Sequence, residues 1–301
     1  MKHTLKITLL LVSIFFITQV IGLAITNEYI STKEYVDPET KEVSKKVIAE
    51  KLPYNIERPK LRESTSYMWL LSAILVGTLL LLVLMKFKKT SLWKLWFFLA
   101  VFSTMSIAFS AFIDPTLAAI LALTLALLKI YRPITIIQNL TEVFIYGGLA
   151  AIFVPIINIF AAFMLLILIS IYDIIAVRHT KHMIKLAKFQ TKSGIFAGLL
   201  IPYDGGEKIA AKKGVKKTAR IAILGGGDIG FPLIFAGVAM KGLMLHNPEL
   251  IGFLKAIIIP IFVSLALLYL LLMSKKDRFY PAMPYLTVGC ILGYFTILLL
   301  F

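Results

Sequence analysis

The chain has 301 residues, of which 59% are hydrophobic and only 16% are charged. Soluble domains are about 45–50% apolar and about 25% charged, so this composition excludes most soluble classes as well as intrinsic disorder. A polytopic membrane protein is the broad class that remains, and the formal net charge of +16 has to be interpreted from where the charges lie relative to the membrane.

Nine apolar segments are candidates to cross a bilayer as helices, which takes about 20 residues each. They cover residues 5–25, 67–85, 92–112, 116–131, 136–155, 156–177, 221–244, 250–273 and 285–301. The fifth and sixth are separated only by Val154-Pro155, where the proline favours a tight break. The first also resembles a signal peptide, but its apolar region is longer than the usual 7–15 or so residues. We therefore predict an all-α membrane protein with nine transmembrane helices.

Two long polar segments divide this chain into three parts. Residues 1–177 carry the first six spans and include the external loop 26–66, residues 178–220 form a basic loop, and residues 221–301 carry the last three spans. Segments 26–66 and 178–220 are too poor in apolar residues to build a core of their own. Both are expected to be loops, and the three parts are expected to form one membrane domain.

Lysine and arginine residues are concentrated in alternate loops, which orients the predicted bundle. With the N-terminus in the cytoplasm, the cytoplasmic segments hold 22 of the 32 Lys and Arg residues, 11 of them in 178–220. This distribution follows the positive-inside rule and predicts an extracytoplasmic C-terminus. The basic loop is expected to lie against anionic lipid headgroups, so the positive charge does not indicate nucleic acid as a partner.

Acidic residues inside membrane spans are costly and therefore mark candidate functional sites. Four lie within or at the ends of the predicted spans: Asp114, Glu142, Asp173 and Asp228. Asp114 precedes a proline at a span boundary and is interpreted as a helix cap. Glu142 belongs to the polar patch 138–142, and it is expected either to form hydrogen bonds within the bundle or to reach the cytoplasmic surface.

The other two acids lie on consecutive antiparallel spans. Asp173 is about four residues from the cytoplasmic end of the sixth span, and Asp228 is about seven residues into the seventh, which gives depths of about 6 and 10 Å. Both carboxyl groups are thus expected in one layer of the membrane. Around Asp228 the sequence is Gly225-Gly-Gly-Asp-Ile-Gly-Phe-Pro232, and small residues of this kind allow membrane helices to approach closely.

Two carboxyl groups about 3 Å apart cannot both ionise at neutral pH, so they share one proton. The ionised member of such a pair can take a proton from water, while the protonated member polarises a peptide carbonyl. The pair Asp173 and Asp228 therefore predicts hydrolysis of peptide bonds within the membrane.

Three segments then resemble the GxGD-type intramembrane aspartyl proteases, the presenilin and signal peptide peptidase family. They are Tyr172-Asp173, Gly225-Gly226-Gly227-Asp228 and Pro281-Ala282-Met283-Pro284, on or beside the sixth, seventh and ninth spans. The matching family segments are Tyr-Asp, Gly-x-Gly-Asp and Pro-Ala-Leu. Because the three occur in order and on the right spans, the resemblance covers essentially the whole chain and implies a presenilin-like fold in a single-chain prokaryotic homologue.

The resemblance implies that Asp173 and Asp228 cleave transmembrane segments of other proteins. It also implies that six further motif residues shape the site: Tyr172, Gly225, Gly227, Pro281, Ala282 and Met283. Met283 replaces the usual leucine with a side chain of similar volume. The implied substrates are single-span membrane proteins in the lipid bilayer, and no cofactor, metal ion or accessory subunit is expected. A substrate span must unwind, and it is expected to add as a strand beside the seventh span and residues 281–284.

Two other functions use the same residues. An ion- or proton-coupled transporter, or a cation leak channel, would bind its ion at Asp173 and Asp228 and would cleave no peptide. A prepilin-type peptidase also has a Gly-x-Gly-Asp segment but cuts outside the bilayer. A zinc protease is disfavoured because the chain has no His-Glu-x-x-His, and His179 and His182 have no carboxylate close in sequence, so we expect them to contact lipid headgroups.

Overall fold

Long apolar helices make up most of the computed structural model, which describes residues 4–36, 43–87, 90–180, 186, 189–190, 194–202, 221–275 and 280–301. Within these residues the helices are α1 (Leu5–Asn27), α2 (Ser66–Lys86), α3 (Thr90–Ser110), α4 (Pro115–Tyr131), α5 (Thr135–Phe153), α6 (Ile159–Ile174), α8 (Gly226–Met244), α9 (Glu249–Ala256), α10 (Ile258–Met273) and α11 (Met283–Leu300). Eight helical segments of the described chain are long and apolar enough to span a membrane, and α4 is a shorter apolar helix. The prediction of an all-α membrane protein with nine spans is confirmed.

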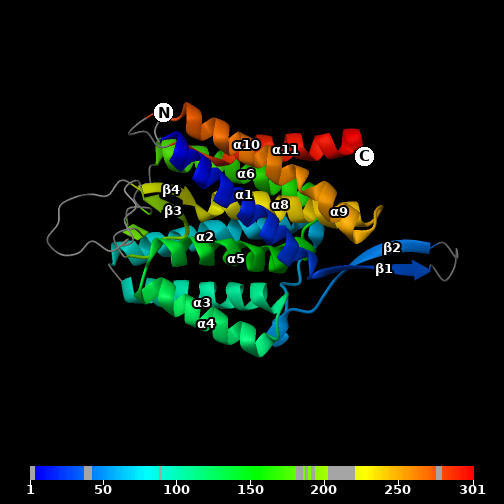
Figure 1. Ribbon diagram of the computed structural model, residues 1–301, viewed down its shortest axis with the longest axis horizontal. Helices are drawn as coiled ribbons and strands as arrows, with labels where there is room; N and C mark the ends of the chain where they lie inside the picture. Colours follow the sequence, from blue (N-terminus) through cyan, green and yellow to red (C-terminus); the bar gives the residue numbers. More distant parts are fainter. Residues whose placement is uncertain are drawn as a thin grey trace.

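The helices run roughly side by side, with α8 near the middle of the bundle (Figure 1). Helix α8 packs against α1, α5, α6, α9 and α11. Helix α2, by contrast, leaves half of its apolar side chains exposed, as expected for a helix whose outer face meets lipid. The segment with a signal-peptide-like composition is α1, and it packs against α5, α8 and α10.

The seventh span begins later than we predicted. Residues 221–225 were expected to be helical but form strand β4 (Ile221–Gly225), which pairs antiparallel with β3 (Gly198–Pro202). Helix α8 therefore starts at Gly226. Its local sequence explains this boundary, because β-branched isoleucines favour an extended chain and the following glycines do not favour a helix.

The eighth span is divided into α9 and α10, which meet at Ile257. Pro260 lies one turn beyond the junction and has no N–H to donate to the carbonyl of Ala256, the last residue of α9. A proline at this position interrupts a helix.

The expectation that residues 26–66 form a plain loop was wrong. This segment contains an antiparallel hairpin of β1 (Ile30–Val36) and β2 (Val43–Ala49), followed by short 3-10 turns at Pro53–Asn55 and Glu63–Thr65. Thr32 fixes the hairpin to α9, since its backbone N–H and hydroxyl both donate to Glu249, at 3.0 and 2.9 Å. The two hairpins lie at opposite ends of the helices (Figure 1).

The basic segment 178–220 also contains structure that we did not predict, namely β3. A π-helical turn, Ile175–His179, extends α6 into its beginning. Residues 203–220 and most of 181–193 lie outside the described residues.

Candidate active site

Asp173 lies at the C-terminal end of α6 and is buried, with 6% of its surface exposed. Its Oδ2 atom accepts a hydrogen bond of 3.1 Å from the backbone N–H of Met283, the first residue of α11. The backbone of Ala282 makes a second polar contact with the same carboxyl group. The segment before the ninth span thus holds one of the two predicted carboxyl groups through its backbone.

A second contact joins the same two helices one turn away. The hydroxyl groups of Ser170 on α6 and Thr287 on α11 lie 2.8 Å apart, and both side chains are buried. Ser170 precedes Asp173 by three residues and Thr287 follows Met283 by four, so the pair lies on the same faces as the Asp173–Met283 contact. Two bonds one turn apart fix both the distance and the rotation of α11 relative to α6.

Asp228 is the third residue of α8, and Gly225 is the N-cap of that helix. The Asp228 carboxyl group accepts a hydrogen bond from the backbone of Gly225. An acidic side chain in the first turn that bonds back to the N-cap stabilises a helix start and interacts favourably with its dipole. The same bond fixes the direction of the carboxyl group, and a Cβ atom at Gly225 would lie 3.3 Å from Asp228 Oδ2.

The two aspartates lie on neighbouring helices. Helix α6 packs against α8, and α11 packs against both. The carboxyl groups of Asp173 and Asp228 lie within electrostatic reach of each other. The predicted position of Asp228, about seven residues into its span, was wrong because we expected that span to begin at residue 221. Asp228 instead lies in the first turn of α8, and strand β4 occupies the residues where we expected the first turns of the helix.

The remaining motif residues surround this pair in different ways. Pro281 and Met283 are buried and Ala282 is half-buried, so the segment packs between helices rather than facing lipid. Gly227 is exposed. Tyr172 is half-buried, and its hydroxyl lies 3.4 Å from that of Thr78 on α2, which connects this peripheral helix to the residue beside Asp173.

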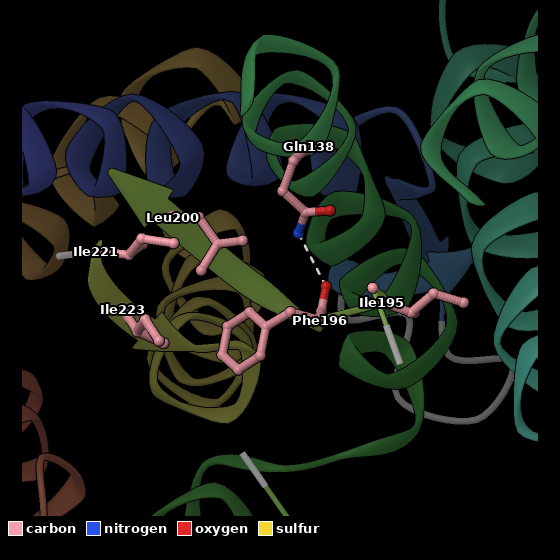
Figure 2. A pocket seen from close by; sticks show the side chains of 7 residues that line it. Gln138, Ile195, Phe196, Leu200, Ile221 and Ile223 are labelled. Atoms are coloured by element: carbon pink, nitrogen blue, oxygen red, sulfur yellow. Dashed lines mark hydrogen bonds between the residues drawn. The ribbon is translucent and has the colours of Figure 1, made fainter. Parts of the chain in front are cut away.

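Sequence reasoning found the polar patch 138–142, which lies on α5, but missed the partners of its side chains. Gln138 donates to the backbone carbonyls of Phe196 and Gly198, at 2.8 and 2.9 Å, and Figure 2 shows it reaching across to the β3–β4 pair beside a small, mainly apolar pocket. Glu142 lies inside the bundle and forms an ion pair of 2.7 Å with Lys129. Of the two placements open for Glu142, the structure has the one with internal hydrogen bonds. The signal in the sequence was the spacing of these polar residues on one helical face.

Another missed residue is Gln19 on α1. Its side chain is fully buried and donates a hydrogen bond of 2.8 Å to the carbonyl of Ile229 in α8. A glutamine inside the first apolar segment was visible in the sequence, but its partner lies 210 residues away.

Two minor predictions concern other polar residues. Asp114 is the N-cap of α4, and its side chain accepts from the backbone of Thr116 and Leu117, which confirms its interpretation as a helix cap. His179 ends the π-helical turn, whereas His182 lies outside the described residues. Among the described residues no three His, Cys, Asp or Glu side chains are grouped to bind a metal ion.

Comparison with known proteins identifies the family. The model of the family described as signal-peptide peptidase, presenilin aspartyl protease matches residues 47–301. The chain belongs to this family. It is an intramembrane aspartyl protease of the presenilin type and an integral membrane protein with several spans. This class differs from the ion transporters and prepilin-type peptidases that the sequence had left open.

Two solved structures, both described as a presenilin family intramembrane aspartate protease, have a similar fold. The one in space group C222 superposes with a TM-score of 0.61 at 18% identity, over 98% of this chain and 99% of the other. The one in space group P2 gives a TM-score of 0.59 at 20% identity, over 97% of each chain. At these low sequence identities, the structural similarity shows a shared fold. No curated protein sequence matches the chain.

Proposed function

We propose that Asp173 and Asp228 are the catalytic pair of this protease and that its substrates are single-span membrane proteins cleaved within their transmembrane segments. The observation that carries this proposal is that two acidic side chains from adjacent helices lie within electrostatic reach of each other and are each held by a backbone N–H of a motif segment. Such fixed carboxyl groups are suited to acid and base roles because their geometry is set before the substrate arrives.

The proposed reaction needs the two carboxyl groups and one water molecule. The ionised carboxylate takes a proton from water while the water oxygen attacks the peptide carbonyl carbon, and the protonated carboxyl group gives its proton to the carbonyl oxygen. The resulting gem-diol collapses when the carboxyl group that took the proton from water gives it to the amide nitrogen, one gem-diol hydroxyl gives its proton to the other carboxylate, and the C–N bond breaks. A new carboxyl end and a new amino end leave, and the pair again shares one proton.

The β3–β4 pair supports a way to hold an unwound substrate. Asn139 on α5 bonds both the N–H and the carbonyl of Leu200 in β3, at 2.9 and 2.8 Å. These groups therefore point away from β4, and the outer edge of β3 is occupied. Ile223 lies opposite Leu200 in the register, so its backbone groups point away from β3. A substrate strand can add at this edge of β4, five residues before Asp228.

The charge distribution supports an orientation for the bundle. An N-terminus in the cytoplasm puts the basic segments 86–94 and 178–220 on that side, together with the β3–β4 pair, because β3 belongs to 178–220 and β4 directly follows it. The C-terminus is then extracytoplasmic. We expect purified chain to act without accessory subunits, because both carboxyl groups and the strand pair come from one polypeptide.

The test of the catalytic pair uses the full chain purified in detergent with a generic single-span substrate. Asp173→Asn and Asp228→Asn should each lower cleavage by at least about 100-fold, since general acid and base groups contribute about 10²–10⁴-fold. Asparagine keeps an oxygen that can accept the backbone bond, so the fold should survive. Asp114→Asn is the matched control, a helix cap in the same chain, and should retain activity. Full cleavage by either site variant would refute the pair, and ion flux in liposomes without cleavage would indicate a transporter.

Strand addition is tested by disulfide cross-linking in a chain whose only cysteine, Cys290, is replaced by alanine. A cysteine replacing Ile223 should cross-link to a cysteine near the scissile bond of the substrate, whereas one replacing Leu200 should not. A substrate that reacts at neither position, and that keeps its helical hydrogen bonds when bound, would contradict this mode of binding.

A further inference from the structure

The first turn of α8, which carries Asp228, is held weakly by its own backbone. Gly226 and Gly227 are its first two residues, and glycine is a poor helix former. Pro232 lies inside the helix and has no N–H to give to the carbonyl of Asp228, four residues earlier. Contacts from other helices must therefore supply part of the stability of this turn.

Two side chains from neighbouring helices reach the turn. Gln19 of α1 donates to the carbonyl of Ile229. From α5, the hydroxyl of Tyr146 lies against Gly226, where an added Cβ atom would come within 2.5 Å of Tyr146 Oη and 3.2 Å of its Cε1. The ring of Tyr146 is buried, with 6% of its surface exposed, so it has little freedom to move aside.

Tyr146 is fixed in turn by a buried polar network. Its hydroxyl donates to Oε2 of Glu142, one turn earlier on α5. The other oxygen of Glu142 accepts from Lys129 at 2.7 Å and from Gln138 at 2.9 Å. Lys129 also donates to the hydroxyl of Thr141 at 2.8 Å. Each partner is buried, and a satisfied network in a low-dielectric interior is rigid.

The same network reaches the strand that precedes α8. Gln138 and Asn139 bond the backbone of the β3 region, and β3 pairs with β4, which runs directly into Gly226. Helix α5 therefore controls the entry to α8 from both sides: it fixes the strand pair before the helix, and it places a hydroxyl against the helix's first residue.

We propose that Tyr146, held by Glu142, is a positioning residue that sets the first turn of α8 and thereby the place of the Asp228 carboxyl group relative to Asp173. The proposal rests on the catalytic role proposed above for these two aspartates. Tyr146 acts through the backbone of Gly226, two residues before Asp228. A displacement of about 1 Å at a reacting group can cost about 100-fold in rate, so a loosened turn should reduce turnover more than substrate binding.

The first experiment removes only the hydroxyl. Tyr146→Phe should lower kcat about tenfold and leave KM within about twofold, because the ring still packs and the β4 edge is unchanged. Tyr269→Phe is the matched control: Tyr269 lies on α10 with more than half of its surface exposed, and its variant should keep the kcat of the parent. An unchanged kcat in Tyr146→Phe would overturn the proposal.

The second experiment makes the same substitution in a background where it should raise kcat instead of lowering it. Gly226→Ala puts a methyl group against Tyr146 Oη and should lower kcat strongly. Removing the hydroxyl in the Gly226→Ala background relieves that overlap, so the double variant should be several-fold faster than Gly226→Ala alone. If Tyr146→Phe slows both backgrounds by the same factor, the hydroxyl does not act through Gly226 and the proposal fails.

A folding defect is distinguished from a positioning defect by titrating the number of folded active sites. A transition-state isostere with a hydroxyl in place of the gem-diol titrates the folded sites, and kcat is expressed per titrated site. A loss that disappears after this correction would mean that Tyr146 only supports folding, and it would overturn the proposal. Asp228→Asn is assayed alongside: its full activity would refute the catalytic pair itself, whereas its inactivity together with normal Tyr146→Phe would refute only the positioning role.

Discussion

Replacing Lys129 by methionine removes one partner of a buried ion pair. Lys129 Nζ lies 2.7 Å from Glu142 Oε1, and both side chains are 1% exposed. At an effective dielectric constant of about 20, two charges at this separation attract by about 6 kcal/mol, and most of this offsets the cost of removing both from water. Breaking such a pair leaves one uncompensated charge and costs about 3–5 kcal/mol of stability.

The double variant Lys129→Met with Glu142→Gln should behave differently. It removes both charges and keeps similar side-chain volumes, and such replacements are often close to neutral or even stabilising. The one oxygen of a glutamine at position 142 can still accept from Gln138, and its NH2 group can donate to the hydroxyl of Tyr146, so the polar contacts on α5 are partly kept. We therefore expect the double variant to be more stable than the single variant, which is a direct consequence of burial.

Thermal unfolding of the purified chain in detergent measures both variants. The single substitution should lower the midpoint by roughly 10 °C, from about 2–4 °C per kcal/mol for a chain of this size. The double substitution should recover at least half of that loss. A single variant with the midpoint of the parent, or a double variant whose loss is the sum of the two single losses, would show that the pair is neither buried nor coupled.

Three further outcomes are expected from the packing and hydrogen bonds. Gly148→Ala should strongly destabilise the chain because its Cβ atom would overlap a backbone carbonyl of α3, whereas Gly77→Ala, with nothing within 4 Å, should stabilise α2 slightly; equal midpoints in thermal unfolding would contradict this. Ser170→Ala and Thr287→Val should each cost about 1 kcal/mol, and the double variant should cost no more than either, so additive losses would refute their 2.8 Å bond. Burial raises the pKa of Tyr29, which follows α1, to about 12. The stability that its protonated hydroxyl contributes to the fold is fully present below about pH 10 and should be lost as the pH rises towards about 12. Tyr29→Phe should flatten this alkaline loss, and an unchanged pH profile would contradict the shift.

Local patterns in the sequence were sufficient for the spans and for the candidate pair. Hydropathy predicts a helix in lipid because the chain must satisfy its own backbone groups there. The breaks at Pro155 and at the polar segment 178–220 were visible for the same reason. The positions of Asp173 and Asp228 on consecutive spans then predicted that they meet, since consecutive spans are antiparallel and commonly adjacent.

The strands and the buried network were not predictable in this way. Strand β4 looked like the start of a helix because its residues are apolar, and apolar runs of about five residues do not distinguish strand from helix. Its state depends on pairing with β3, which lies across the segment 203–220. Glu142 could not be assigned to interior or surface, because its partner Lys129 is on another helix.

The amino-acid sequence by itself therefore determined the membrane class and the number of spans, and it singled out Asp173 and Asp228 as the candidate pair. These follow from the cost of placing polar backbone and charged side chains in lipid, a cost that each segment meets on its own. The tertiary structure alone decided where α8 begins, which backbone N–H holds each carboxyl group, and which side chains of α5 fix the strand pair. Those features depend on contacts between residues distant in the chain, such as Gln19 with Ile229, and such contacts exist only once the helices have packed.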